Sequence, residues 1–222
     1  VLGIAPLLTP HLMGIGEVLH VQGAVHFDRG DVSLAEKFYQ EALTIRRKTH
    51  DQRGLVRTLN NLGAVWMSQR LERSVGVWRE ALQVAQELGD LGFQATLADN
   101  LGEALMLLGR NDEARDALQR AVELAQLTGR RATLIDALRN LALLETTEES
   151  WDAADLALAR ARDEANALGV ARLRALVCRT MGDVAVARME STGVVSGDGA
   201  MNAAEANYRK AGQDFEAAGY DI

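Results

Sequence analysis

Four histidines and one cysteine are the residues of this chain whose spacing bears most directly on zinc ligation and thiol chemistry. The histidines are His11, His20, His26 and His50, and no two of them have the four-residue spacing that places two imidazoles on one helical face for zinc. The single cysteine, Cys178, excludes a disulfide within the chain and fits a reducing compartment, so we expect a cytoplasmic location. These residues predict no metal site and no cofactor.

Other catalytic patterns are missing or uninformative. The sequence has no Gly-x-x-x-x-Gly-Lys-Ser/Thr loop to hold phosphate. Serine, histidine and aspartate are numerous enough to fit a triad by chance, and Cys178 stands at a position expected to be buried. We therefore predict that the chain is not an enzyme.

Composition favours a helical protein, and the net charge argues against nucleic acid or an anionic membrane as its partner. Only two prolines occur, Pro6 and Pro10, and the rest is rich in strong helix formers. The formal net charge of -7 argues against a nucleic-acid surface or an anionic membrane surface. No apolar run is long enough to span a membrane. The excess of arginine over lysine hints at a bacterial source.

A repeat of about forty residues organises the chain. The strings VQGAVHF, NLGAVWM, NLGEALM, NLALLET and TMGDVAV place one small residue at steps of 40, 39, 40 and 40. These marker residues are Gly23, Gly63, Gly102, Ala142 and Gly182. A small-large-small series at helical spacing follows each marker, as in Ala35, Tyr39 and Ala42. The second to fifth copies then close on a glycine expected to cap a helix, at Gly89, Gly129, Gly169 and Gly219.

Each copy therefore predicts two helices joined by a tight turn, with small residues that allow close approach and large ones that fill the space between them. The expected pairs are 12–50, 52–89, 91–129, 131–169 and 171–219. Together they form one solenoid from 12 to 222. Residues 1–11 are expected to be a linker or the end of a preceding element. In the fifth copy about ten extra residues, 191–200, contain three glycines and predict a surface loop. In the fourth copy Glu145 stands at a usually apolar place, so this pair should be the loosest.

The pattern Leu59-xx-Leu62-Gly63-xx-Trp66 resembles the tetratricopeptide repeat, in the long variety found in kinesin light chains and in the tails of bacterial signalling regulators. The resemblance implies an all-α, right-handed superhelix (a solenoid) of five helix pairs. It also implies a concave groove, lined by the first helix of each pair, that binds a protein or peptide segment. His20 and Ala24 stand where chaperone-binding relatives carry a carboxylate clamp, so such a clamp is not expected.

The repeat phase predicts which polar residues face that groove. Asn61, Asn100 and Asn140 recur two residues before the marker, and asparagines at this place hold peptide backbone in the kinesin-light-chain-like repeats. Packing against the neighbouring pair is the alternative role for these amides. The predicted groove residues are Arg57, Asn60, Asn61, Asp99, Asn100, Glu103, Asp136, Arg139, Asn140, Arg179 and Asp183.

The sequence thus predicts a non-enzymatic scaffold module that binds proteins or peptides and does not contact nucleic acid or membrane directly. One alternative is a sensory or regulatory segment of a larger bacterial signalling or transcription-regulating protein. A second alternative is a self-association module, and hence a homo-oligomer, because an uncapped end of a solenoid exposes apolar surface.

Overall fold

The computed structural model describes residues 5–193 and 198–220, and every regular element within these ranges is an α-helix. The helices are α1 (Ala5–Asp28), α2 (Val32–Thr49), α3 (Gln52–Trp66), α4 (Leu71–Glu87), α5 (Leu91–Leu107), α6 (Asn111–Leu127), α7 (Arg131–Thr147), α8 (Trp151–Leu168), α9 (Ala171–Thr192) and α10 (Asp198–Ala217). Each expected pair corresponds to two of these helices. The first helix begins at Ala5, before the expected residue 12, and includes Pro10.

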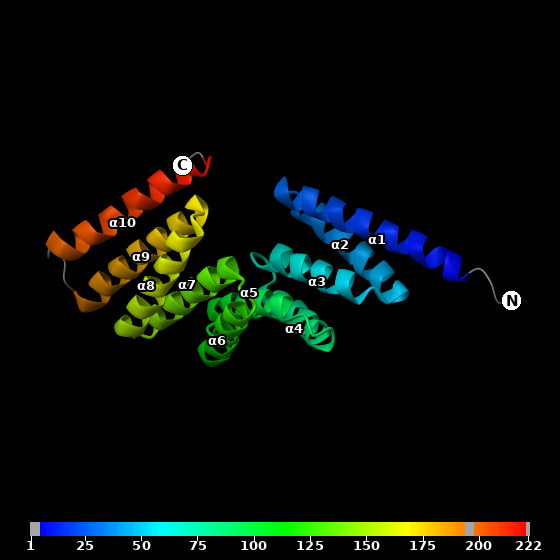
Figure 1. Ribbon diagram of the computed structural model, residues 1–222, viewed down its shortest axis with the longest axis horizontal. Coiled ribbons are helices and arrows are strands. Elements are labelled where there is room, and N and C mark those ends of the chain that lie inside the picture. The colour runs from blue at the N-terminus through cyan, green and yellow to red at the C-terminus, as the bar shows by residue number, and fades with distance from the viewer. Residues whose placement is uncertain (1–4, 194–197, 221–222) are drawn as a thin grey trace. The chain divides into compact units, whose positions relative to one another are not determined.

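The chain divides into two compact units, residues 1–109 with α1 to α5 and residues 110–222 with α6 to α10. Within each unit every helix packs against the next one along the chain, as α9 and α10 do in Figure 1. The first helices of consecutive pairs also touch, α1 with α3 in one unit and α7 with α9 in the other. This contact between first helices is the stacking that the repeat predicts.

Three of the marker glycines lie directly against aromatic rings of the following helix. A methyl group built on the glycine would meet ring atoms at 2.7 Å for Gly23 and Tyr39, 2.4 Å for Gly63 and Trp78, and 2.7 Å for Gly182 and Tyr208. In the fourth pair Ala142 packs in one buried cluster with Leu158. The expected roles of small and large residues are confirmed, because no larger side chain fits at these glycines without displacing a ring.

The glycines that close the copies take the left-handed backbone conformation expected of helix caps. Their φ angles are 66° at Gly89, 68° at Gly129, 76° at Gly169 and 80° at Gly219. His50 closes the first copy with φ 54° although it is not a glycine. A side chain is thus held in a region that glycine occupies at lower cost.

The expected loop at 191–200 is partly wrong. Helix α9 continues to Thr192 and ends at Gly193, whose φ is 65°, and α10 already begins at Asp198. Residues 194–197 of this segment lie outside the described residues. Most of the inserted residues are therefore taken up by longer helices rather than by a loop, since α9 and α10 have 22 and 20 residues where α5 and α6 have 17 each.

A buried arginine joins the first three helices. Arg46 of α2 is 1% exposed and donates hydrogen bonds to the carbonyl of Gly54 and the hydroxyl of Thr58, both on α3. It also donates to Glu17 Oε2 of α1 at 2.6 Å. Burial lowers the pKa of Arg46, and the Glu17 carboxylate opposes that effect. Nearby, His20 of α1 is buried and its Nδ1 lies 3.1 Å from Thr58 Oγ1.

The carboxylate of Glu145 in the fourth pair is buried, with 8% exposure, but it is not unpaired. Arg115 of α6 donates a hydrogen bond to Glu145 and a second one to Glu148 Oε2 at 2.6 Å. The hydrogen bond from Arg115 to Glu145 contributes most to the raised pKa of Arg115. An ion pair between two helices therefore occupies the place where the third copy buries Leu105.

None of the helices in the described ranges combines the length and the apolar character that crossing a bilayer requires. Among the described residues, no group of three or more histidine, cysteine, aspartate or glutamate side chains is placed to hold a metal ion.

Replacement of Gly63 by alanine tests the contact between the paired helices. The added methyl group would lie 2.4 Å from Trp78 ring atoms, so we expect Gly63→Ala to lower the free energy of unfolding by about 1–3 kcal/mol. Gly76→Ala is the matched control, because it lies on α4 with no heavy atom within 4 Å and should gain up to about 1 kcal/mol of helix stability. Urea unfolding measures both, and equal effects of the two substitutions would contradict the packing role.

The buried His20 predicts a loss of stability in acid. Burial and Arg46 lower the pKa of His20 from 6.5 to about 4, so between these values the unfolded chain binds a proton that the folded chain does not. Stability should therefore be complete above pH 6.5 and fall as the pH drops towards 4, by about 1–3 kcal/mol from this group. Unfolding midpoints of the wild type and His20→Gln across this range measure it, and an unchanged pH slope in the variant would exclude His20 as the source.

Candidate functional site

All the predicted groove residues lie on first helices, as the repeat phase requires. Arg57, Asn60 and Asn61 are on α3, Asp99, Asn100 and Glu103 on α5, Asp136, Arg139 and Asn140 on α7, and Arg179 and Asp183 on α9. The residues on α3 and α5 belong to the first unit and the others to the second. The set is therefore examined unit by unit.

Three of the predicted asparagines form one hydrogen-bonded chain in the first unit. The side-chain amide of Asn100 donates to Asn60 Oδ1 at 2.8 Å, and that of Asn60 donates to Asn61 Oδ1 at 3.3 Å. Asn61 Nδ2 then donates to the Tyr39 hydroxyl at 3.3 Å. The backbone carbonyl of Asn60 also accepts a hydrogen bond from Trp78 Nε1 at 3.1 Å. These amides therefore link α5, α3 and α2, whatever else they bind.

A small pocket lies where Asn61 ends this chain of amides. Its volume is about 230 Å³, and it is lined by Ala24, Phe27, Asp28, Tyr39, Asn61 and Ala64. Ala24 and Ala64 occupy the same repeat position on α1 and α3, one residue after the marker glycine, and their small side chains leave the pocket open. Phe27 is 39% exposed and supplies an apolar wall.

The charged groove residues of the first unit differ in exposure. Arg57 is exposed and pairs with Glu17, with 3.1 Å between Nη2 and Oε1. Asp99 is only 7% exposed, whereas Glu103 is half-buried. Of the predicted charges in this unit, Arg57 is thus the one most accessible to a partner.

In the second unit the predicted residues form two small groups. Asp136 and Arg139 form an ion pair on α7, with 3.9 Å between Oδ1 and Nη2. Burial raises the pKa of Asp136, and the charge of Arg139 opposes that effect. Asn140 is 3% exposed. On α9, Asp183 is exposed and its Oδ1 accepts a hydrogen bond from the Tyr208 hydroxyl at 2.9 Å, while Arg179 is also exposed.

Sequence reasoning missed the contribution of Tyr39 to the pocket. The residue was expected in the core, and it is 1% exposed, yet its hydroxyl reaches the pocket and accepts a hydrogen bond from Asn61. Phe27 and Asp28 were missed because they precede the turn, where the repeat pattern makes no prediction. A tyrosine at a core position was the available signal for the pocket, because its buried hydroxyl needs a hydrogen-bond partner nearby.

The arrangement around Asn61 offers groups that can bind a ligand. An amide and a phenol can exchange hydrogen bonds with a ligand, Phe27 can cover an apolar part of it, and Asp28 supplies a negative charge. Burial raises the pKa of Tyr39, so its hydroxyl stays protonated at neutral pH. Such a mixture of apolar walls and a few convergent polar groups is typical of binding pockets.

Two sequence models of one family match the repeats of this chain. Residues 14–87 and residues 94–128 match sequence models of the family described as Tetratricopeptide repeat. None of the curated proteins matches the chain. The two matches cover the first three copies of the repeat.

Solved structures of the same fold cover most of the chain. BtubC (BKLC) from P. vanneervenii has a TM-score of 0.75 at 21% identity, with 98% of this chain and 88% of that chain covered. A Rap protein complexed with Competence and Sporulation Factor has a TM-score of 0.71 at 14% identity, with 93% and 65% covered. Kinesin light chain TPR-like repeats from Podosopora anserina have a TM-score of 0.69 at 13% identity, with 93% and 97% covered. At these identities the likeness shows the fold.

The family matches, the structural neighbours and the contacts within the pairs all indicate the same helical-repeat fold. Ten helices in the described residues correspond to five tandem pairs, with three marker glycines against aromatic rings. The structural neighbours include kinesin-light-chain repeats, which the long repeat resembles, and Rap proteins. Residues 14–87 and 94–128 are therefore tetratricopeptide repeats, and the described helices form five pairs in an all-α fold shared with these solenoids.

Proposed function

We propose that this chain is a non-enzymatic module that binds an extended segment of another protein on the face formed by its first helices. The pocket at Asn61 carries the proposal, because it lies on this face between α1 and α3 and joins an amide, a phenol and an exposed phenyl ring. The single buried thiol of Cys178 supports action in a reducing compartment such as the cytoplasm.

The chemistry of the pocket suits a peptide backbone. The Asn61 side chain has two amide hydrogens, of which one bonds to Tyr39, and it can offer the other to a peptide carbonyl. Because the bond from Asn100 through Asn60 to Asn61 fixes these amides in advance, little side-chain entropy remains to be lost on binding. Phe27 would cover an apolar side chain of the bound segment, and Asp28 would favour a basic one.

Relatives of the same fold support a ligand-binding role. The Rap protein with a TM-score of 0.71 is complexed with Competence and Sporulation Factor. Tetratricopeptide solenoids present large continuous faces because each pair contacts only its neighbours. In this chain the corresponding face of the first unit carries the pocket and the accessible Arg57.

Two substitutions test the pocket by different routes. Asn61→Ala removes the amide, whereas Ala64→Leu fills the pocket without removing a polar group and repeats the leucine found at the same position of the fourth copy, Leu143. We expect each to weaken binding of the captured partner about tenfold or more. Partners are captured from a lysate of the source organism, identified by mass spectrometry, and their affinities are then measured by calorimetry.

Ala132→Leu is the control, because Ala132 is exposed on α7 in the other unit. Circular dichroism checks that the helices of each variant are intact. Partners that bind both pocket variants as tightly as the wild type would refute groove recognition at Asn61.

Self-association is a second candidate, favoured by apolar residues on one face of α1. Val18, Val21 and Val25 follow helical spacing and are 58%, 50% and 41% exposed. A second copy of the chain could cover this stripe, since exposed apolar patches mark interaction surfaces.

Sedimentation across a hundredfold range of concentration, roughly 1–100 µM, tests self-association. We expect a concentration-dependent dimer that Val21→Glu abolishes and that Leu156→Glu, a change at a 74% exposed residue of α8, leaves intact. A monomer at every concentration would remove this candidate.

A further inference from the structure

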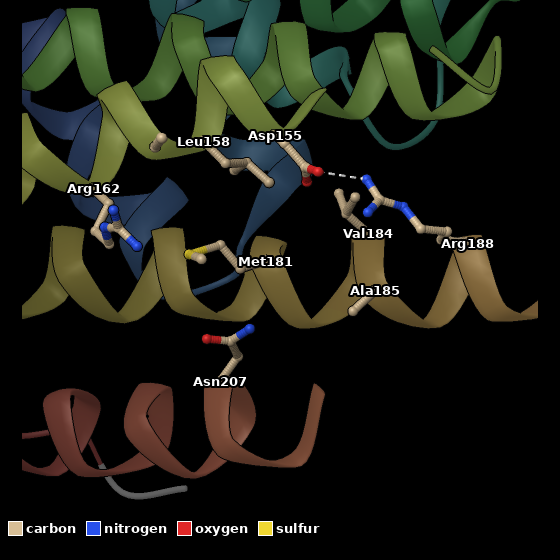
Figure 2. Close-up of a pocket in the computed structure, with 9 residues that line it drawn as sticks. Asp155, Leu158, Arg162, Met181, Val184, Ala185, Arg188 and Asn207 are labelled. Carbon is tan, nitrogen blue, oxygen red and sulfur yellow. Dashed lines mark hydrogen bonds and ion pairs between the residues drawn. The ribbon is translucent and has the colours of Figure 1, made fainter. Parts of the chain in front are cut away.

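A second cleft, outside the predicted groove residues, opens between α8 and α9 in the second unit. Its volume is about 290 Å³, and Figure 2 shows its lining residues. Leu158 and Val184 form a buried apolar floor with the half-buried Met181, and Asn207 of α10 reaches it from the far side of α9. The cleft thus combines an apolar floor with polar groups at its edge.

The cleft exists because the fifth copy departs from the repeat at two positions. Three residues after the marker the other copies carry larger side chains, His26, Trp66, Leu105 and Glu145, whereas the fifth carries Ala185. The position of Asn207 is occupied in the other copies by Phe38, Val77, Ala117 and Ala157. The small Ala185 side chain enlarges the cleft and Asn207 adds an amide to its wall, so the two changes together form a site that the repeat pattern does not require.

The two ends of the cleft carry different charges (Figure 2). At one end Arg188 donates to Asp155 Oδ2 at 2.8 Å and lies over the Trp151 ring, with 5.3 Å from its Cζ to the ring centroid. This arginine is therefore neutralised and held in place. At the other end the side chain of Arg162 is 46% exposed, and its nearest carboxylate is that of the adjacent Asp163 at 3.7 Å. Arg162 is thus the cation with capacity for a further anionic partner.

We propose that this cleft binds a short segment of a partner protein that places an aliphatic side chain on the apolar floor and a neighbouring carboxylate on Arg162. Leu158, Met181 and Val184 contact the aliphatic group, and Ala185 leaves the space that it fills. The amide of Asn207 can donate to and accept from a peptide bond, which favours a peptide over a simple organic acid. The exposed guanidinium of Arg162, which has only a long contact to Asp163, favours an acidic residue beside the aliphatic one.

The site is independent of the function proposed above. It contains no residue of the first unit, and none of its lining residues belongs to the predicted groove set. Loss of binding at Asn61 would therefore leave this cleft intact, and the reverse also holds.

Met181 provides a direct reporter of occupancy. The full chain is labelled with methyl-13C methionine, and the Met181 signal is assigned by its loss in Met181→Leu. The probes are acetyl-Leu-Glu-amide and acetyl-Leu-Gln-amide, which differ only in the carboxylate. We expect both to shift the Met181 signal, with the Glu probe binding about three- to tenfold more tightly because of Arg162.

Two variants decide the assignment. In Arg162→Gln the two probes should bind equally, while Arg160→Gln, a change on the same helix at a residue outside the cleft lining, should keep the preference for the Glu probe. Ala185→Leu, which copies the leucine of the third copy at Leu105, should fill the cleft and weaken both probes about tenfold or more. An unmoved Met181 signal at millimolar probe, a preference that survives Arg162→Gln, or wild-type binding by Ala185→Leu would each overturn the proposal.

Discussion

The contact of a glycine on one helix with an aromatic ring on the next is the constraint on which the first, second and fifth helix pairs depend. At Gly63 even a methyl group would lie 2.4 Å from Trp78, so the backbone of α3 rests directly on the indole ring. The same geometry recurs at Gly23 with Tyr39. Because interiors are close-packed, each such contact fixes the separation of two helices and the position of every side chain on their exposed faces. The pocket at Asn61 is one result, since Tyr39 both contacts Gly23 and bonds to Asn61.

Most of the fold follows from the periodicity of the sequence. A small residue recurs about every forty positions because the paired helices must approach closely there. Glycine recurs at Gly89, Gly129 and Gly169 because the backbone needs a positive φ at these helix ends. Both requirements are local, so a single sequence is enough to reveal them. The insertion of the fifth copy was harder to predict. Glycines suggested a loop throughout 191–200, but Asp198 already begins a helix, because a glycine disfavours a helix by only about 1 kcal/mol and tertiary packing can offset that.

The polar interactions were predicted less well than the packing. The repeat phase placed Asn60, Asn61 and Asn100 on one face, but it could not show that they bond in a chain, because side-chain rotamers and partners on other helices decide such bonds. The cleft beside Arg162 was not predicted either. Its signal was the absence of a large residue at Ala185, and such departures gain meaning only when the neighbouring helices are known.

The buried Arg46 has a consequence for how this chain could have grown or could be rebuilt. Its guanidinium donates hydrogen bonds to Glu17 on α1 and to Gly54 and Thr58 on α3. The first copy therefore needs part of the second copy to satisfy this buried group. At the same place the second, third and fourth copies carry Ala85, Ala125 and Ala165. A duplication, deletion or transplant that cuts between the first two copies would leave a buried cation without its partners. A cut between the third and fourth copies would likewise separate the buried Glu145 carboxylate from Arg115. Only boundaries without such a buried charge pair are free of this cost.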